Sequence, residues 1–421
     1  MKINLRTKGI YFFVFLLFFN LFFPTFNNVL DENGGTGVLI INFTMFLFLF
    51  SHMIYSYVYK RLVFTNIELI SIFIALSFSV NIIITSVTNN ELIFADVYEL
   101  FRPVYYLVCF LYGFNLIRLN TVSVDTYIKY MSFAILFTAF FSLLCIVFIN
   151  SFGLNIISFY AKYSLIPNLR FTGTFQNPYD FAFISALPLS YFLTKFISSG
   201  SKLNLIYVSV ILITMAFGQS KSGFITLLSV ITLNLLLYKF YESNSERSKG
   251  VNLRLIFFPV FFFTASIGTY IIYADQFQYL INGLISMSSG GDRSSQIRLE
   301  QLFVLLNMMS ENIFNLLVGF GSYKNSDLMF ESQYSLYLFR YGFYGVFLLS
   351  CFILFPLLIF SLSKKISGLQ KMIVLLFIYS AIPSGFGNNV LDQSRIPFLY
   401  FSFLGVIFSV IMQTHRHKEE M

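Results

Sequence analysis

Long apolar runs separated by short polar segments repeat along most of this chain. Most of the runs contain about 20 residues, the length of an α-helix that crosses the hydrocarbon core of a bilayer. Apolar residues occupy every face of such a run, as expected for a helix that lipid surrounds. The pattern therefore predicts twelve membrane-spanning helices. They cover residues 10–28, 37–57, 67–87, 101–118, 127–149, 178–197, 203–219, 222–240, 254–274, 333–361, 369–386 and 394–413.

The first apolar run has some features of a secretory signal peptide. It is too long for the apolar part of such a peptide, and no small-residue cleavage site follows it before Asp31. We therefore interpret it as the first spanning helix.

Composition supports a membrane protein. The chain of 421 residues is 57% hydrophobic and contains 57 Phe and 27 Tyr, whereas only 11% of its residues are charged. Soluble globular proteins carry about 25% charged residues. We therefore expect an all-α polytopic membrane protein that forms one transmembrane domain over residues 1–421. The expected domain has an extended outer loop at 275–332, before the tenth helix, and within this loop QIRLEQLFVLLNMM (296–309) has a helix-like pattern.

The distribution of Lys and Arg predicts the orientation, because cytoplasmic segments of membrane proteins are enriched in them. With the N-terminus inside, most of the 27 basic residues lie on the inner side and most of the 19 acidic residues on the outer side. Both termini are then cytoplasmic. This asymmetry also accounts for the net charge of +8, so we do not expect a nucleic-acid partner.

Metal and cofactor sites are not expected. The three cysteines lie in apolar runs without CxxC spacing, and none of the three histidines lies in an outer segment. A His/Asp/Glu metal cluster and a Ser-His-Asp set therefore have no support. The outer loops also contain no Asp-x-Asp, so a metal-bound nucleotide-sugar site is not indicated.

Some basic residues remain on the outer side or at outer helix ends. For each one alone, a snorkelling charge at a helix end is the ordinary explanation. As a set, they persist on the side that the positive-inside rule depletes. If they converge in space, they suit a phosphate-bearing ligand, because Arg binds phosphate oxygens bidentately. They are Arg102, Lys162, Arg170, Lys221, Arg293, Arg298, Lys324, Arg340 and Arg395.

Two polar segments precede apolar runs on the outer side. RFTGTFQNPYDFAF (170–183) contains Arg170, Gln176 and Asn177. Pro178 favours a helix start, so Asn177 is either a cap or a ligand contact. GQSKSG (218–223) is a tight turn that its two glycines allow, and it places Lys221 at the mouth of the bundle or simply in solvent.

The tenth predicted span begins FESQYSLYLFRYGFYG (330–345). Glu331 lies at its outer end, where a helix dipole also favours a carboxylate. Arg340 lies about 13 Å deeper and on the opposite face, so the two side chains are not expected to serve one site unless the helix is broken. An arginine in the hydrocarbon is costly and is usually functional or paired.

The segment ADVYELFRP (95–103) precedes the fourth span. Asp96, Glu99 and Arg102 recur at every third residue and share one face of a helix. This spacing favours internal ion pairs over a ligand site.

Four of these segments together resemble the O-antigen polymerase (Wzy-type) and O-antigen ligase superfamily. They are FTGTFQNPYD (171–180), GQSKSG (218–223), SSQIRLEQ (294–301) and GFGSY…ESQYSLYLFRYGFYG (319–345), which occur in the family's order. The resemblance implies a membrane-embedded glycosyltransferase of the GT-C kind in the bacterial cytoplasmic (inner) membrane.

Such an enzyme transfers a glycan from undecaprenyl diphosphate to an acceptor sugar on the outer face. In polymerases the acceptor is the non-reducing end of another lipid-linked repeat unit, and a chain-length regulator protein is a further partner. In ligases the acceptor is lipid A-core. Ligases usually carry His-Asn or His-Ser at the position of Glu331, so this chain resembles a polymerase more closely.

The family chemistry suits the residue types present. A diphosphate leaving group carries negative charge that basic side chains stabilise without a metal, and a carboxylate can accept the proton of the attacking hydroxyl. Direct displacement inverts the anomeric carbon. The resemblance implies Glu331 as general base, Arg170, Lys221 and Arg298 as diphosphate clamp, and Arg102, Arg340, Gln176 and Asn177 as further substrate contacts.

A lipid-linked oligosaccharide flippase or other transporter is the alternative from another class. Transporters bind substrate near the midplane, often beside ionisable residues. Here the span interiors look nearly free of charge apart from Arg340, and no two-half repeat is visible. A lateral groove opening outward beside Glu331 would favour the enzyme, and a central cavity reachable from both sides would favour the transporter. A purely structural scaffold leaves the outer basic residues unexplained.

Overall fold

The computed structural model of the chain describes most of the predicted spans. Every regular element in the described part is helical. The described residues are 5–26, 35–88, 96–161, 170, 173–243, 254, 257–258, 281–283, 285–286, 291–322, 330–362 and 366–419.

Nine helices in these ranges are long and apolar enough to cross a membrane, as a multi-pass membrane protein requires, and two shorter apolar helices accompany them. Helices coincide with eleven of the twelve predicted spans, whereas nearly all of the predicted span at 254–274 lies outside the described residues. The elements are α1 (Leu5–Phe22), α2 (Gly35–Ile54), η1 (Tyr55–Tyr59), α3 (Asn66–Thr88), α4 (Asp96–Arg118), α5 (Val124–Val147), η2 (Ile149–Gly153), α6 (Leu154–Ser158), α7 (Pro178–Ser199), α8 (Lys202–Gly218), α9 (Lys221–Ser243), α11 (Arg293–Ser310), α12 (Ile313–Val318), α13 (Gln333–Leu362), α14 (Gly368–Tyr379), α15 (Ala381–Gly387) and α16 (Ile396–Glu419).

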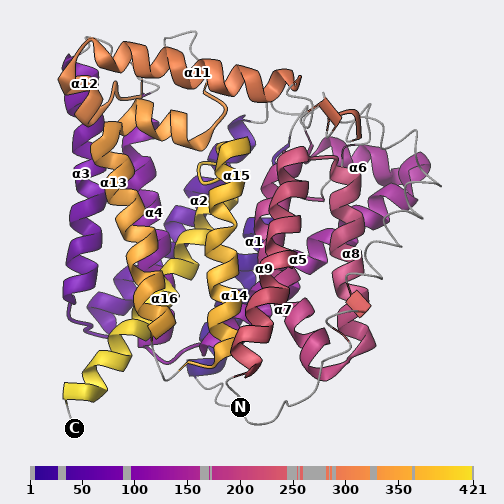
Figure 1. Cartoon of the computed structure of the whole chain (residues 1–421). Helices are drawn as coiled ribbons and strands as arrows, with labels where there is room; N and C mark the ends of the chain where they lie inside the picture. Colours follow the sequence, from indigo (N-terminus) through magenta and orange to yellow (C-terminus); the bar gives the residue numbers. More distant parts are fainter. Residues whose placement is uncertain are drawn as a thin grey trace.

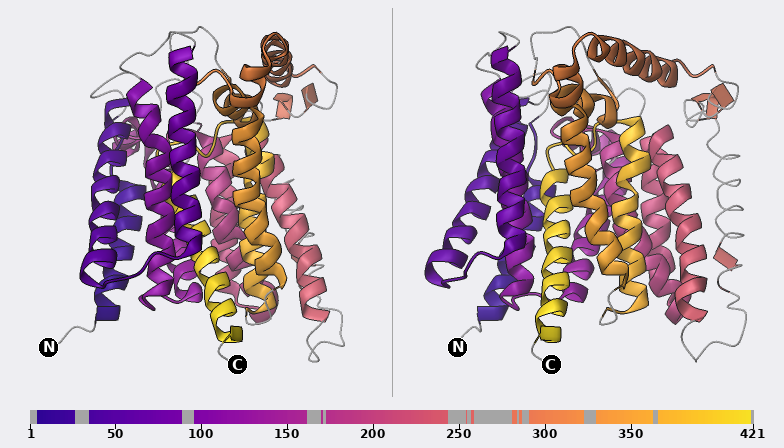
Figure 2. Two further views of the ribbon diagram at one scale, coloured as in Figure 1. Left: turned by 90° about the vertical axis from the view of Figure 1, so that its left-hand side faces the viewer. Right: turned by 60° about the vertical axis from the view of Figure 1, so that its left-hand side comes forward.

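The long helices stand side by side, and the two ends of the chain lie at the same end of the bundle (Figures 1 and 2). At the opposite end, α11 lies across the tops of the spans. This helix was expected within the predicted outer loop, at 296–309, and it begins where the Asp292 carboxylate accepts the backbone N–H of Ser295. We refer to the end that carries α11 as the α11 end.

Close packing of α4 against α16 forms the centre of the bundle. Gly113 and Gly405 make it close, because a Cβ at either position would lie about 2 Å from a backbone carbonyl oxygen of the other helix. Phe110 and Phe408 then pack across the same contact. Small residues at a helix contact are a common solution in membranes, where van der Waals packing replaces the hydrophobic effect as the driving force.

Helix α13 is broken at Gly342, which has φ 61° and ψ −168°. The break frees the carbonyls of Phe339 and Arg340, and the backbone N–H groups of Phe320 and Gly321 donate to them at 2.7 and 3.2 Å. Every backbone group needs such a partner where no water is present. The segment after α12 therefore packs into the break and holds the start of α13 in place.

We expect Gly342→Ala to destabilise the protein. The backbone conformation is one that essentially only glycine adopts, at a cost of about 1–3 kcal/mol for other residues, and a Cβ would also lie 2.4 Å from the Leu317 carbonyl oxygen. Thermal unfolding in detergent should show a clearly lowered Tm. Gly385→Ala is the matched control, since its Cβ would meet nothing closer than 3.3 Å. Equal Tm values for the two variants would contradict this account of the break.

Candidate functional site

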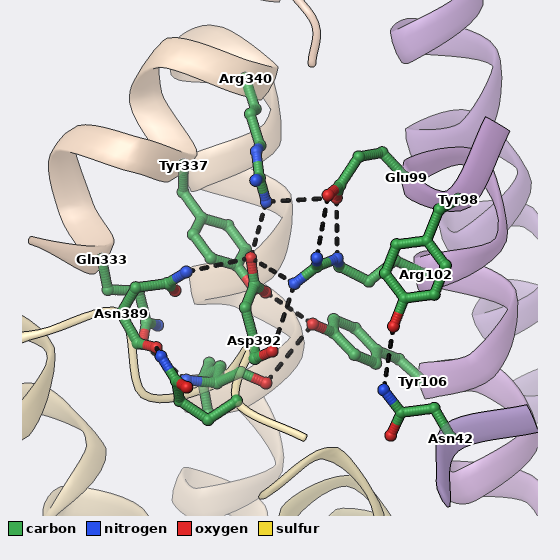
Figure 3. Close-up of polar contacts among 12 residues, drawn as sticks. Asn42, Tyr98, Glu99, Arg102, Tyr106, Gln333, Tyr337, Arg340, Asn389 and Asp392 are labelled. Atoms are coloured by element: carbon green, nitrogen blue, oxygen red, sulfur yellow. Dashed lines mark hydrogen bonds and ion pairs between the residues drawn. The ribbon is translucent and has the colours of Figure 1, made fainter. Parts of the chain in front are cut away.

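Four buried charged side chains meet between α4, α13 and the turn that joins α15 to α16 (Figure 3). We call Glu99, Arg102, Arg340 and Asp392 the ionic cluster. Asp392 Oδ2 lies 2.8 Å from Arg102 Nη1 and 2.6 Å from Arg340 Nη1. Glu99 Oε2 lies 2.8 Å from Arg102 Nε and 3.4 Å from Arg340 Nη1. Two positive and two negative charges therefore neutralise one another.

Hydrogen bonds complete the surroundings of Asp392. The hydroxyls of Tyr106 and Tyr337 donate to its Oδ1, each at 2.6 Å, and the Asn389 amide donates to its Oδ2 at 3.2 Å. Burial alone would raise the pKa of the Asp392 carboxyl, but the charges of Arg102 and Arg340 hold that pKa well below its usual range. The carboxylate therefore stays ionised.

The ionic cluster bears on three predictions made from the sequence. The ion pair between Glu99 and Arg102 was expected and is confirmed. Arg340 was expected to be nearly alone among charges inside the predicted spans, and Glu99 and Asp392, which flank those spans, lie beside it with side chains 2% and 3% exposed. Arg102 and Arg340, named as candidate substrate contacts, bind carboxylates here and line neither of the two cavities described below.

Three other predicted residues, Arg170, Lys221 and Arg298, line one cavity of about 500 Å³ at the α11 end. We call it the cationic pocket. Its walls come from the start of α7, the turn between α8 and α9, the first turns of α11, and α15. The lining residues are Arg170, Tyr179, Gln219, Ser220, Lys221, Ser222, Ile225, Asp292, Ser294, Ser295, Arg298, Leu299, Pro383, Phe386, Gly387 and Asn388.

Lys221 stands at the first residue of α9, directly after the predicted tight turn. The turn reverses at Gln219, which has φ 46°, and not at a glycine as the sequence was interpreted. Ser220 Oγ accepts the N–H of Gly223, and Gly223 instead allows α9 to approach Ala182 of α7. The Lys221 ammonium lies 2.6 Å from Asp292 Oδ1 and so connects α9 to the start of α11.

Arg298 and Glu331 form the second ion pair of the cationic pocket, with 2.9 Å between Arg298 Nη2 and Glu331 Oε2. Arg298 also donates to Ser294 Oγ one turn earlier, at 2.7 Å. Half of the Glu331 side chain is exposed, and its backbone N–H donates to Gln301 Oε1. Glu331 lies two residues before α13, and it and Arg340 belong to different clusters, as their spacing along the predicted tenth span implied.

The carboxylate of Asp292 holds the Lys221 side of the pocket together. Burial alone would raise the pKa of Asp292, but hydrogen bonds from Lys221 and Ser295 lower that pKa below its ordinary value. Asp292 is therefore an ionised partner that orients Lys221 and caps α11 at the same time.

Gln176 and Asn177 are buried beside the start of α7. Asn177 occupies the position before the first residue of α7, but its side chain makes no capping bond. Its amide donates instead to Asp180 Oδ2 at 3.2 Å and to Gln393 Oε1 at 3.4 Å. Neither residue lines the cationic pocket, so Asn177 here connects α7 to the turn before α16.

The remaining outer basic residues have other surroundings. Arg395 is almost fully buried and donates to the backbone carbonyls of Asn20 and Phe23 at the end of α1. Burial lowers the pKa of Arg395 to about 10. Arg293 is exposed at the start of α11. Lys162 and Lys324 lie outside the described residues.

Sequence reasoning missed Asp392 and Asp292 as partners of the predicted cations. Asp392 follows an apolar stretch between two spans, and Asp292 precedes the helical pattern of α11 by one residue. An acidic residue three positions before Ser295 is a weak capping signal. Nothing in the local pattern pairs either carboxylate with an arginine or lysine tens or hundreds of residues away.

Over the described ranges, no group of three or more His, Cys, Asp or Glu side chains has a geometry that could hold a metal ion. Searches of protein families and of curated proteins find no match to this chain. The geometry of the cationic pocket and the ionic cluster is therefore the basis for a functional proposal.

We expect Asp392→Asn to be severely destabilising. It leaves two buried guanidinium groups with one carboxylate, and breaking a buried ion pair costs about 3–5 kcal/mol. Glu331→Gln breaks a half-exposed pair and should cost about 1 kcal/mol or less. Unfolding of the purified variants in detergent measures both values.

A double variant provides the control. Asp392→Asn leaves one cation in excess and Arg340→Met removes one cation, so the double variant should lose less stability than the two single changes added together. Strict additivity, or equal losses for Asp392→Asn and Glu331→Gln, would contradict the proposed role of the ionic cluster.

Proposed function

We propose that this protein is a polysaccharide polymerase of the bacterial cytoplasmic membrane. It would transfer a glycan from undecaprenyl diphosphate to the non-reducing end of another lipid-linked repeat unit on the outer face. One observation carries the proposal: Arg170, Lys221 and Arg298, which are far apart in the chain, line one pocket whose Arg298 is paired with Glu331. The resemblance of the same segments to the O-antigen polymerase and ligase superfamily supplies the substrate class.

The proposed reaction is a direct displacement. The acceptor hydroxyl oxygen bonds to the anomeric carbon of the donor sugar, the bond from that carbon to the diphosphate oxygen breaks, and undecaprenyl diphosphate leaves with the electron pair. The hydroxyl proton passes to Glu331. The ion pair with Arg298 positions the Glu331 carboxylate at the cationic pocket, where a general base would accept that proton.

The two ion pairs of the cationic pocket give the donor a means of binding. Lys221 and Arg298 each hold one carboxylate in this structure, and each has further donor groups for phosphate oxygens. When a diphosphate binds, Arg298 would exchange Glu331 for a phosphate oxygen and release the carboxylate next to the acceptor. Charge that grows on the leaving diphosphate is then stabilised by cations already in place.

The arrangement of the chain supports an outer location of this pocket. Both termini lie at the end of the bundle away from α11. Lys60 and Arg61 follow η1 at the end of the second span, and Arg118 ends α4. With these basic residues in the cytoplasm, as the positive-inside rule favours, the α11 end faces outward.

The ionic cluster bears on the transporter alternative. Its four charges are the kind of ionisable group that a transporter uses to bind substrate, but they are satisfied by one another and by two tyrosines. The cationic pocket is at one end of the bundle. We therefore favour an enzyme, and Glu331 in place of the ligase histidine favours a polymerase over a ligase.

Glu331→Gln and Arg298→Ala should each abolish long polymer in cells that lack the native copy. Removal of a general base typically costs 10²- to 10⁴-fold in rate, and removal of Arg298 takes away a cation that would stabilise the leaving diphosphate. Polymer length is read on a gel of extracted glycan, and protein abundance by immunoblot. Arg61→Ala, an exposed cation at the opposite end, is the matched control. Full-length polymer in both variants would refute the assignment of these residues.

Glycan analysis of a deletion strain distinguishes the classes. Loss of long chains with survival of single capped repeat units is expected for a polymerase. Complete loss of capping would instead indicate a ligase or a flippase and would contradict the proposed function.

A further inference from the structure

A second cavity, of about 490 Å³, lies beside the cationic pocket between α9, α13, α14, α15 and α16. We call it the apolar groove. Its walls are almost entirely aliphatic and aromatic. The lining residues are Leu233, Leu237, Gln333, Tyr334, Tyr337, Val346, Leu349, Ser350, Ile353, Leu354, Leu375, Leu376, Ile378, Tyr379, Ala381, Ile382, Leu391 and Tyr400.

The polar atoms of the apolar groove are concentrated near the start of α13. Gln333 uses its Oε1 to accept the Leu391 N–H, and Tyr334 donates its hydroxyl to the Ile382 carbonyl at 2.9 Å. Farther along α13, Leu354 belongs to the same lining and is 46% exposed. The groove thus has a polar end toward the cationic pocket and an apolar, partly open end within the spans.

Helix α15 separates the two cavities. Pro383 and Phe386 line the cationic pocket, whereas Ala381 and Ile382 line the apolar groove. The rings of Tyr334 and Phe386 lie 4.6 Å apart, one from each cavity, so a single aromatic contact forms the boundary. A ligand that spans both cavities would displace these rings, and with them the hydrogen bond from the Tyr334 hydroxyl to the Ile382 carbonyl.

We propose that the apolar groove binds the hydrocarbon chain of the amphiphile whose diphosphate occupies the cationic pocket. This inference depends on the proposed function for the anionic headgroup only. A molecule with a diphosphate at one end and a long polyprenyl chain at the other matches the order of the two cavities. Its chain would pass the contact between Tyr334 and Phe386 and continue between α9 and α13 toward Leu354.

A bilayer lipid that simply fills the groove is the competing occupant. Its chain would be bound irrespective of any group in the cationic pocket, because hydrocarbon is equally well solvated by surrounding lipid. A specific polyprenyl chain would instead bind more tightly together with its headgroup, since one molecule contacts both cavities. Binding measurements with and without the chain therefore separate the two occupants.

The test uses the full chain in nanodiscs and two probes, undecaprenyl diphosphate and inorganic diphosphate. Ser350→Phe places a ring in the groove, and Cys351→Phe places the same ring at the next residue of α13, which is exposed and outside the lining. Ser350→Phe should weaken undecaprenyl diphosphate binding about tenfold relative to Cys351→Phe, a difference of about 1.4 kcal/mol. Inorganic diphosphate should bind both variants equally.

A second measurement uses the wild type, so its result does not depend on whether the phenylalanine variants fold. A diazirine on the chain of undecaprenyl diphosphate should crosslink the wild type at Leu233 or Leu237 of α9, and an excess of inorganic diphosphate should reduce that crosslink. Equal affinities of the two variants for undecaprenyl diphosphate, or a crosslink that inorganic diphosphate leaves unchanged, would overturn the proposed groove.

The outcomes for the groove and for the proposed function are separate. If Ser350→Phe and Cys351→Phe bind undecaprenyl diphosphate equally well and both still support polymer synthesis, the proposed role of the groove is overturned and the proposed function is not. A different result is that the purified protein binds undecaprenyl diphosphate through the groove while a strain that lacks the protein still makes normal polymer. That result supports the groove and overturns the proposed function.

Discussion

The cost of a buried charge is the constraint on which the architecture depends. The side chains of Glu99, Arg102, Arg340 and Asp392 are all largely removed from solvent, and each lies against a partner of opposite charge, as a costly buried charge requires. Because they come from α4, α13 and the turn before α16, their mutual pairing fixes these three elements relative to one another. The α15–α16 turn borders both cavities, through Asn388 and Leu391, and the start of α13 borders the apolar groove, so the ionic cluster also helps to set the shape of the site.

Two kinds of ion pair therefore have different roles. The pairs of the ionic cluster are buried and reinforced by Tyr106 and Tyr337, which suits a permanent structural connection. The pair of Lys221 with Asp292 lines the cationic pocket, and the pair of Arg298 with Glu331 lies beside it, where half of the Glu331 side chain is exposed. Exposed pairs are worth little in stability and can be exchanged for a ligand. Charged residues of the same types thus stabilise the fold in the ionic cluster and remain available for binding at the cationic pocket.

The two cavities join these roles in one proposed site. A cationic pocket at the α11 end and an apolar groove among the spans are divided only by α15 and one aromatic contact. Such an arrangement matches a molecule that is charged at one end and apolar along its length. In the proposed reaction, the cations at this end of the bundle would meet the diphosphates and glycans of two lipid-linked molecules.

The sequence by itself determined the spans, the helix above them and the ion pair of Glu99 with Arg102, because apolar length and spacing of three residues are local properties. It also placed Glu331 and Arg340 on different faces. It did not determine which outer cations converge, since Lys221 and Asp292 are 71 residues apart and Arg102 and Asp392 are 290 apart. The break at Gly342 and the reversal at Gln219 were likewise decided by packing against other segments. Only the tertiary structure sets such contacts, because the energy that selects them comes from partners distant in the chain.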